Sequence, residues 1–308
     1  MPNYGVIDLG SNSIRLVIYS VKDNAEKPFS KKDFRSLINE KKIAGLSAYV
    51  VDGAFTEEGV RKAVDVLSEH LRRARNFNCA ETRIFATAVL RNCTNSKDAT
   101  RAISDAVGFP IEIISARDEA HLGFVGATCD RSIETGTLID IGGGSTELTV
   151  IEGGSDKLSV SLDQGSVSSY ARFVEMILPT ASEMSAIEDA FKERLFEMGD
   201  LGPYRAPKLY GIGGSVRAAA KLYGEAFGGG GRPKTLEQHQ LDAAIGLLER
   251  SPSTFAHRAV KAVPERLHTV VPGSLIALAL MCELGADRLE ICKYGIREGY
   301  LIERILNA

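Results

Sequence analysis

The sequence predicts an α/β protein made of two domains with related cores. Three observations carry this prediction: the length of 308 residues, an internal echo of one hairpin pattern, and strand-like runs that alternate with helical patterns. A single domain usually holds about 100–150 residues, so the length favours two. Strands that alternate with helices indicate a partly parallel sheet. We place the domains at residues 1–124 and 125–308, with the last helix, about 296–308, free to pack back on the first domain.

The internal echo is a sequence repeat with two copies: VIDLGSNSIRLVI, which starts at Val6, and LIDIGGGSTELTV, which starts at Leu138. Each copy has an apolar run that ends in Asp, a turn of small residues, and a second run with alternating apolar residues. This pattern is typical of a β-hairpin. The identical pairs are Ile7/Ile139, Asp8/Asp140, Gly10/Gly142, Ser13/Ser145 and Leu16/Leu148. The two copies predict that both domains open with the same hairpin.

The region between the two copies alternates between helices and strands. Thr56 is placed to cap a helix, and a second helix is expected near residues 96–107. The apolar residues on one face of the first helix are Val60, Val64, Leu67 and Leu71. The runs 82–87 and 111–115 are typical of buried strands.

The second half repeats this alternation. Helices are expected near 182–198, 215–223, 235–249, 273–284 and from 296 onward, and strands at 208–212 and 288–292. The glycine-rich segment 227–235 is expected to be a flexible spacer.

Composition excludes several classes of function. The net charge of −3 gives no basic footprint for nucleic acid, and the apolar run from Leu275 is too short to span a membrane. The chain does not open with a signal peptide, and its five cysteines lack C-x-x-C spacing. We therefore expect a cytoplasmic protein with reduced thiols, bound neither to nucleic acid nor to a membrane.

Three glycine turns, at residues 8–13, 140–147 and 211–215, share one chemistry. Glycine lets a backbone approach an anion closely and point several N–H groups at it, and Ser or Thr hydroxyls add donors. A carboxylate beside such a cradle repels phosphate, so Asp8 and Asp140 are expected to hold a hard divalent cation. These turns predict phosphate binding with the help of a metal ion.

Paired hairpins of this kind resemble those with which the actin-like ATPase superfamily grips phosphates. A narrower resemblance rests on five strings in order: DLGSNSIRL, TAVLRNCTN, IISARDEA, DIGGGSTE and YGIREGYL. Together they resemble the exopolyphosphatase/guanosine pentaphosphate phosphohydrolase (Ppx/GppA) family, in a short two-domain form. The resemblance implies two actin-like (ribonuclease H-like) domains with the active site in a cleft between them. It also implies metal-dependent hydrolysis of phosphoanhydride bonds.

The resemblance also implies roles for individual residues. Glu119 matches the general base that activates the attacking water, and Glu147 joins Asp8 and Asp140 around Mg²⁺ or Mn²⁺. The expected substrate contacts, including those of the third glycine turn, are Ser11, Asn12, Ser13, Arg91, Asn95, Gly142, Gly143, Gly144, Ser145, Thr146, Gly213, Gly214 and Ser215. Arg91 suits this task because its planar guanidinium can grip a phosphate with two bonds.

Three positions depart from the family pattern. Asp118 replaces the first glutamate of an E-E-A segment, and His121 stands where an arginine is usual. Lys293 replaces a frequent acidic residue before YGIREG. The change at His121 removes one positive charge near the expected substrate site.

The leading hypothesis is an exopolyphosphatase, which releases terminal orthophosphate from inorganic polyphosphate. Hydrolysis of guanosine pentaphosphate is the alternative within the family, because both substrates present the same terminal group. An actin-like ATPase or kinase and a non-catalytic sensor of polyphosphate or alarmone are the alternatives from other classes. The resemblance also favours a homodimer.

The letters D-E-A-H at residues 118–121 spell a helicase signature. A helicase also needs the phosphate-binding loop G-x-x-x-x-G-K-[ST], and the chain contains no Gly-Lys pair. We therefore interpret the four letters as a coincidence.

Overall fold

The computed structural model describes residues 1–308 and divides the chain into two compact units. Unit 1 comprises Met1–Ser132 and Tyr294–Ala308, and unit 2 comprises Ile133–Lys293. The boundary expected at residues 124/125 falls inside helix α4 (Ala116–Thr128), because that helix continues without a break past this point.

Unit 1 is built on a five-stranded sheet with the order β3-β2-β1-β6-β7. The strands of unit 1 are β1 (Asn3–Leu9), β2 (Ser13–Val21), β3 (Phe34–Ile43), β6 (Cys79–Ala86) and β7 (Ile111–Ile113), with a separate ribbon of β4 (Val50–Val51) and β5 (Ala54–Phe55). Strands β1, β2 and β3 form an antiparallel meander, while β1, β6 and β7 run parallel. The predicted first hairpin is therefore confirmed, and the carboxyl ends of three parallel strands meet at one edge.

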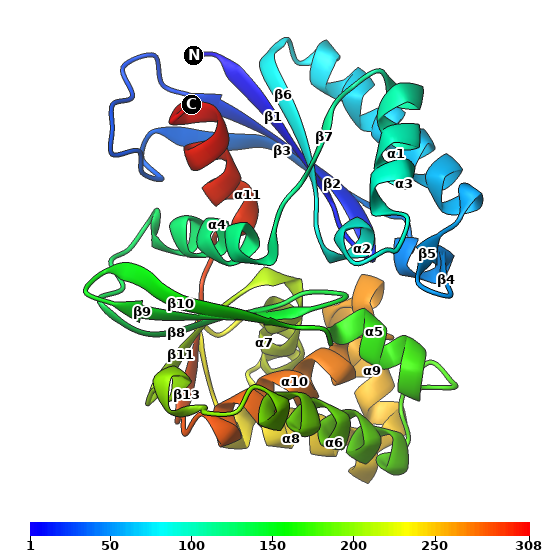
Figure 1. The fold of residues 1–308 in the computed structure, drawn as a ribbon. Coiled ribbons are helices and arrows are strands. Elements are labelled where there is room, and N and C mark those ends of the chain that lie inside the picture. Colours follow the sequence, from blue (N-terminus) through cyan, green and yellow to red (C-terminus); the bar gives the residue numbers. More distant parts are fainter. The chain divides into compact units, whose positions relative to one another are not determined.

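Helices cover both faces of this sheet (Figure 1). The helices of unit 1 are η1 (Leu46–Tyr49), α1 (Glu57–Asn76), α2 (Ala88–Arg91), α3 (Ser96–Val107), α4 and α11 (Ile296–Tyr300), which continues into a π-helical turn, η4 (Leu301–Leu306). Along β1 and β2 the buried side chains alternate: Ile7 and Ile14 pack with α1, whereas Val6 and Tyr19 pack with Tyr300 of α11. Period-two alternation thus gives one sheet two cores.

The helix expected after Thr56 is confirmed. The Thr56 hydroxyl accepts the N–H of Gly59 at 3.2 Å, which satisfies one of the unpaired donors at the helix start. The helix expected near 96–107 coincides with α3, and the two expected strands correspond to β6 and β7.

Unit 2 repeats the topology of unit 1 and adds an edge strand. Its six-stranded sheet has the order β10-β9-β8-β11-β13-β12. The strands of unit 2 are β8 (Thr135–Ile141), β9 (Thr146–Glu152), β10 (Ser155–Leu162), β11 (Lys208–Ile212), β12 (Thr235–Glu237) and β13 (Arg288–Ile291). Again a meander of three strands precedes two parallel ones, β11 and β13. The shared strand order confirms that the two units have related cores.

The helices of unit 2 pack into two buried clusters with the sheet and with one another. They are α5 (Ser166–Phe173), α6 (Ala181–Glu197), η2 (Gly202–Tyr204), α7 (Gly213–Phe227), α8 (Gln238–Arg250), α9 (Pro252–Ala262), η3 (Pro264–Arg266) and α10 (Val270–Glu283). Helix α10 packs against both α6 and α8 and is buried along most of its length (Figure 1). The helix expected at 235–249 begins at Gln238 instead, because residues 235–237 pair with β13 as an edge strand.

None of the helices has both the length and the apolar character that a membrane crossing requires.

Candidate active site

The glycine turns of the two repeat copies, at residues 10–13 and 142–145, have the same hydrogen bond, each within its own unit. The Gly10 N–H donates to the Ser13 carbonyl at 3.2 Å, and the Gly142 N–H donates to the Ser145 carbonyl at 2.9 Å. In each case an Asp precedes the turn by two residues, near the end of the first strand of the hairpin. The sequence echo therefore corresponds to a real structural repeat.

In unit 1, three expected site residues lie at or after the carboxyl ends of parallel strands. Asp8 lies near the end of β1, Arg91 in the short helix after β6, and Glu119 in the helix after β7. Cross-strand pairing brings Asp8 opposite Phe85 of β6, and Ala86 opposite Ile113 of β7. The carboxyl edge of a parallel sheet is where α/β proteins commonly bind ligands.

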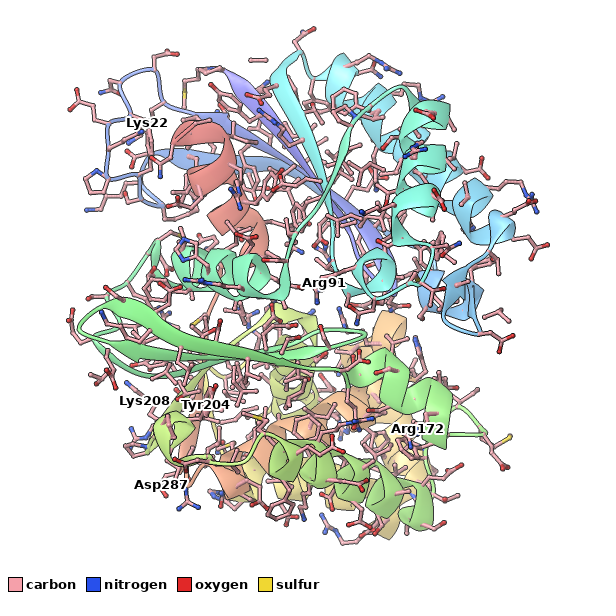
Figure 2. The ribbon with its side chains drawn as sticks, viewed as in Figure 1. Lys22, Arg91, Arg172, Tyr204, Lys208 and Asp287 are labelled. Carbon is pink, nitrogen blue, oxygen red and sulfur yellow. The ribbon has the colours of Figure 1, made fainter.

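Glu119 and Arg91 form an ion pair. The Arg91 Nη1 atom donates to Glu119 Oε2 at 2.6 Å and lies 3.3 Å from the Ile114 carbonyl. Both side chains are mostly buried, with 11% of Glu119 and 16% of Arg91 exposed. Figure 2 labels Arg91 at the end of the short helix α2. The pair fixes the orientation of a carboxylate and a guanidinium at the same edge of the sheet.

The helix that carries Glu119 has a defined start. The Ser115 hydroxyl accepts the Asp118 N–H at 3.0 Å and donates to the Asp118 carboxylate at 2.7 Å. The hydroxyl, together with Arg304, holds the pKa of Asp118 below its ordinary value. Asp118 therefore belongs to the cap, and Glu119 follows it in the first helical turn.

The first turn is anchored through its carbonyl groups. The Asn12 carbonyl accepts the N–H groups of Ala44 and Gly45, and the Ser11 carbonyl accepts that of Ser47. The Asn12 amide nitrogen is buried and makes no hydrogen bond. Ser13 begins β2. The segment 44–47 thus fixes the backbone of the turn, while the amide nitrogen of the Asn12 side chain remains without an acceptor.

Asn95 has a partner elsewhere in unit 1. Its amide donates to the Phe55 carbonyl at 2.9 Å and accepts the Phe55 N–H at 2.8 Å. These two bonds tie the start of α3 to β5. The side chain of Arg91 has other partners, Ile114 and Glu119, and the role of Asn95 as a substrate contact stays a prediction.

In unit 2, the second turn forms a cradle of backbone donors. The carbonyls of Gly142 and Gly143 accept N–H groups from the first turn of α5, at residues 166–168. The N–H groups of Gly143, Gly144 and Ser145 have no acceptor within unit 2. Backbone donors gathered in this way suit an anion.

The third glycine turn lies against the second. Gly213 has a φ of +83°, and a Cβ there would lie 2.2 Å from Asp140 Oδ1. A Cβ on Gly214 would lie 2.0 Å from an Nη atom of Arg266. The positive φ favours glycine at position 213, whereas the neighbour of Gly214 is the flexible end of the Arg266 side chain. The start of α7 thus meets Asp140 and a guanidinium. The Ser215 hydroxyl contacts the Ser166 hydroxyl at 3.2 Å.

Asp140 and Glu147 are cross-strand partners in β8 and β9, which places their side chains on the same face of the sheet. Glu147 is buried and accepts the hydroxyls of Ser145 at 2.6 Å and Ser161 at 2.8 Å. Two neighbouring carboxylates repel each other unless donors or a cation compensate them. The neighbouring Thr146 hydroxyl donates to the Gln164 carbonyl at 2.7 Å.

The residues differ in how well they fit a hard metal ion. Oxygen ligands from Asp140 and Glu147 match the preference of Mg²⁺ or Mn²⁺. Asp8 fits less well, because its carboxylate is already paired with Arg297 at 2.8 Å. In neither unit do three or more His, Cys, Asp or Glu side chains gather as a metal site.

Comparison with known proteins places this geometry in a family. The profile of the Ppx/GppA phosphatase family matches residues 17–308. The chain belongs to the Ppx/GppA phosphatase family. The glycine turns and the Glu119–Arg91 pair therefore lie in a chain of a phosphatase family.

Relatives of this Ppx/GppA chain carry two kinds of name. Exopolyphosphatase 1 of Mycobacterium tuberculosis is 24% identical over 308 residues, which cover 98% of this chain and 88% of that protein. Guanosine-5'-triphosphate,3'-diphosphate pyrophosphatase of Vibrio vulnificus is 28% identical over 225 residues, which cover 72% of this chain and 44% of that protein.

Solved structures support the same fold. The Ppx/GppA family member of Aquifex aeolicus has a TM-score of 0.77 at 22% identity and covers 99% of this chain and 98% of its own. An exopolyphosphatase of Cytophaga hutchinsonii has a TM-score of 0.81 at 19% identity, covering 98% of both chains. The fold is the predicted actin-like α/β fold in two domains.

Two arginines of this Ppx/GppA phosphatase were not among the predicted site residues. Arg297 lies within the quoted string YGIREGYL, so the family pattern pointed to it without giving a role. Arg266 follows Pro264-Glu265 in a short 3-10 helix, and no motif marks it. Only the tertiary fold brings Arg266 to the Gly214 backbone.

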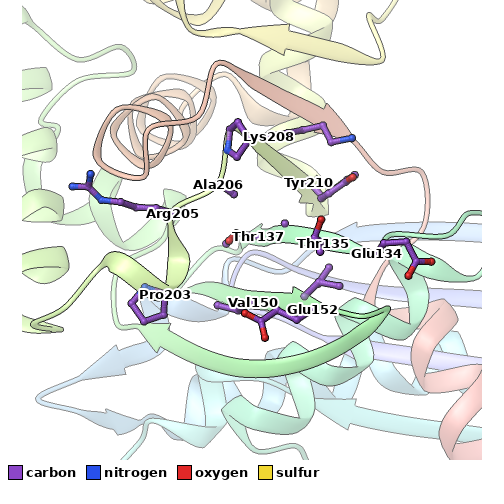
Figure 3. A pocket seen from close by; sticks show the side chains of 13 residues that line it. Glu134, Thr135, Thr137, Val150, Glu152, Pro203, Arg205, Ala206, Lys208 and Tyr210 are labelled. Atoms are coloured by element: carbon purple, nitrogen blue, oxygen red, sulfur yellow. The ribbon is translucent and has the colours of Figure 1, made fainter.

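Unit 2 of the Ppx/GppA chain also has an open groove of about 550 Å³ (Figure 3). It lies at the amino ends of β8 and β11, the opposite ends of these strands from the glycine turns. Tyr210 and Lys208 line it, with the Lys208 ammonium 4.7 Å from the centre of the Tyr210 ring. Glu134 and Glu152 add negative charge, so the groove has no single electrostatic character.

Proposed function

We propose that the protein is an exopolyphosphatase, which hydrolyses the terminal phosphoanhydride bond of inorganic polyphosphate and releases orthophosphate. One observation carries the proposal: a glycine turn with three unpaired N–H groups lies beside the carboxylates of Asp140 and Glu147. Donors for an anion next to ligands for a cation suit a phosphate–metal complex. Membership in a phosphatase family and the exopolyphosphatases among the relatives support this choice of reaction.

In this proposal the N–H groups of residues 143–145 and the start of α7 hold the terminal phosphate. Asp140 and Glu147 would hold Mg²⁺ or Mn²⁺, which neutralises negative charge on the phosphoryl group. Water forms a new bond to the terminal phosphorus as the bridging P–O bond breaks, and the shortened polyphosphate leaves. Glu119 accepts the proton of this water.

Arg91 has two tasks in the proposal. Its guanidinium orients Glu119 through the 2.6 Å contact, and its remaining donors suit a phosphate oxygen. Asp8 acts through the first turn rather than as a metal ligand on its own. Ser11, Asn12 and Ser13 remain candidate donors to the substrate, and the unsatisfied Asn12 amide is a specific reason to include them.

Glu119→Gln tests the proposed base. We expect a loss of orthophosphate release on the order of 10²–10⁴-fold, because the amide cannot accept the proton of water. Binding of polyphosphate should change little, because glutamine keeps the size of the side chain. Phosphate release and equilibrium binding to a labelled polyphosphate measure the two effects separately.

Asp118→Asn is the matched control. Asp118 adjoins Glu119 and caps the same helix, but asparagine can still accept the Ser115 hydroxyl, so activity should remain close to that of the wild type. Normal turnover by Glu119→Gln would refute the assignment of the base. Equal losses in both variants would indicate damage to the helix rather than loss of a catalytic group.

Guanosine pentaphosphate is the second candidate substrate, favoured by the Vibrio vulnificus relative named for that chemistry. Both substrates offer a terminal phosphoanhydride, so the cradle alone does not distinguish them. Orthophosphate release from polyphosphates of several lengths and from guanosine pentaphosphate, each with Mg²⁺ and with Mn²⁺, decides between them. A cytoplasmic location and a homodimer of the 33.2 kDa chain are further parts of the proposal, and light scattering tests the dimer.

A further inference from the structure

The segment Tyr294–Ala308 returns to unit 1 and joins its sheet through consecutive residues. Arg297 pairs with Asp8 of β1 at 2.8 Å, and Glu298 accepts the Tyr19 hydroxyl of β2 at 2.7 Å. A Cβ on Gly299, the next residue, would lie 1.9 Å from the Leu122 carbonyl of α4. One short helix is thus fixed to β1, to β2 and to the helix that carries Glu119.

Glu298, the residue after Arg297, is held in place by two hydrogen bonds, and its partner Tyr19 has a fixed protonation state. Glu298 is buried and also accepts the Gly295 N–H at 3.0 Å, which closes the first turn of α11. Burial, and next the neighbouring Glu298 carboxylate, raise the pKa of Tyr19 well above its ordinary value. The phenol therefore stays protonated and donates to Glu298. This arrangement leaves Arg297 little freedom to move away from Asp8.

Burying the Arg297–Asp8 pair costs desolvation free energy that a purely structural contact could avoid. Both side chains are mostly buried, with 17% of Arg297 and 15% of Asp8 exposed, and the Arg297 Nε atom is buried without an acceptor. Buried ion pairs are often replaceable by apolar residues without loss of stability. A pair with an unsatisfied donor, two residues before a candidate phosphate turn, is better explained by function than by packing.

We infer that Arg297 is a positioning residue, which fixes the Asp8 carboxylate at the first glycine turn and supplies its positive counter-charge. The C-terminal segment would thereby complete the part of the active site that unit 1 provides. This inference rests on the proposed function, because it assumes that Asp8 contributes to phosphate hydrolysis. It gives the string YGIREG a physical role: its arginine orients an aspartate that lies 289 positions earlier in the chain.

A double-mutant cycle tests the inference. Full-length wild type, Arg297→Gln, Asp8→Asn and the double variant are compared for kcat and KM in orthophosphate release, and for their midpoints of urea unfolding. A misplaced Asp8 should lower kcat on the order of 10²-fold with little change in KM. Because Arg297 acts through Asp8, the double variant should lose no more kcat than Asp8→Asn alone.

Two further variants separate positioning from folding. Arg297→Lys keeps the charge but not the planar fork, so it should recover part of the kcat that Arg297→Gln loses. It also keeps the cycle usable if Arg297→Gln does not fold. Arg304→Gln, in the same segment, removes an exposed contact to Asp118 and should change kcat less than about twofold, as surface ion pairs contribute little.

Additive losses in the cycle, or a wild-type kcat in Arg297→Gln, would overturn this inference. So would an equal loss in Arg304→Gln, because it would point to general loosening of the segment. A folded wild-type chain that releases no orthophosphate from polyphosphate or guanosine pentaphosphate would instead overturn the proposed function. The two failures are therefore distinguishable.

Discussion

At the scale of single residues, His70 is a buried base close to the first glycine turn. It is fully buried on α1, its Nε2 atom lies 3.3 Å from the Ile14 carbonyl, and its Nδ1 atom has no partner. Burial lowers the pKa of His70, although the Ile14 carbonyl and the carboxylates of Glu40 and Glu69 oppose this effect and Lys42 adds to it. The folded protein therefore keeps the imidazole neutral.

This predicts loss of stability in mild acid. The pKa of His70 is lower in the folded state than the value of about 6.5 in the unfolded chain, so the unfolded state binds more protons below that pH. The contribution of His70 to the free energy of unfolding is complete above about pH 6.5 and declines as the pH falls below it. Urea unfolding of the wild type and of His70→Gln between pH 5 and pH 8, about the range in which histidine titrates, measures the effect.

The wild type should lose stability more steeply than His70→Gln on the acid side, and the two slopes should agree on the alkaline side. Parallel curves over the whole range would contradict the prediction. Ile14 directly follows Ser13, so acid loosening of this contact should also reach the first turn.

The residues of the candidate site differ in how far the sequence could foretell them. Glu119, Asp8 and Asp140 lie in local strings whose spacing carries information. The partners of these groups come from distant segments: Asp8 meets Arg297, and the turn at Gly214 meets Arg266. Such pairs depend on tertiary packing. The sequence alone therefore indicates an acidic residue such as Asp8, but it does not show which arginine is its partner.

At the scale of elements, helices α4 and α11 approach each other through glycine. A Cβ on Gly126 of α4 would lie 1.9 Å from the Gly295 carbonyl at the start of α11. Gly126→Ala should therefore force the two helices apart and lower the free energy of unfolding by about 1–3 kcal/mol, as overpacking commonly does. Because α4 carries Glu119, orthophosphate release should fall as well.

Gly246→Ala is the matched control within helix α8. Its nearest neighbour would be the flexible end of the Arg250 side chain, which can move aside. Alanine should then raise helix stability by up to about 1 kcal/mol through its better intrinsic propensity. Urea unfolding and phosphate release of both variants provide the check, and equal stability of the two would contradict the proposed close approach.

The elements that the sequence predicted best were those with a strong local pattern. Strand β11 matches its expected bounds, and α3 matches as well, because their apolar periodicity and flanking residues agree. Strand β12 was missed, since its residues 235–237 become a strand only by pairing with β13. Strands β3 and β10 were not anticipated either: they are edge strands whose mixed polarity resembles that of a loop.

At the scale of the whole molecule, each unit has cores drawn only from its own residues. Both buried clusters of unit 2 lie within Ile133–Lys293. One cluster of unit 1, however, includes Tyr300, Leu301, Ile302 and Ile305 from the C-terminal segment. The chain order of unit 1 is therefore discontinuous: its core is completed by the last segment of the chain, for which packing back on the first domain was an expectation from the sequence.

This arrangement predicts different behaviour for fragments of the two units. Residues 133–293 should fold alone, whereas residues 1–132 should not, because the fragment lacks four buried side chains worth about 1.5–3 kcal/mol each. That sum approaches the typical total of about 5–15 kcal/mol for a domain. Joining residues 294–308 to residue 132 by a flexible linker should restore cooperative folding of unit 1. Circular dichroism during urea unfolding measures each fragment, and a cooperatively folded fragment 1–132 without the segment would show that the C-terminal residues are dispensable for this core.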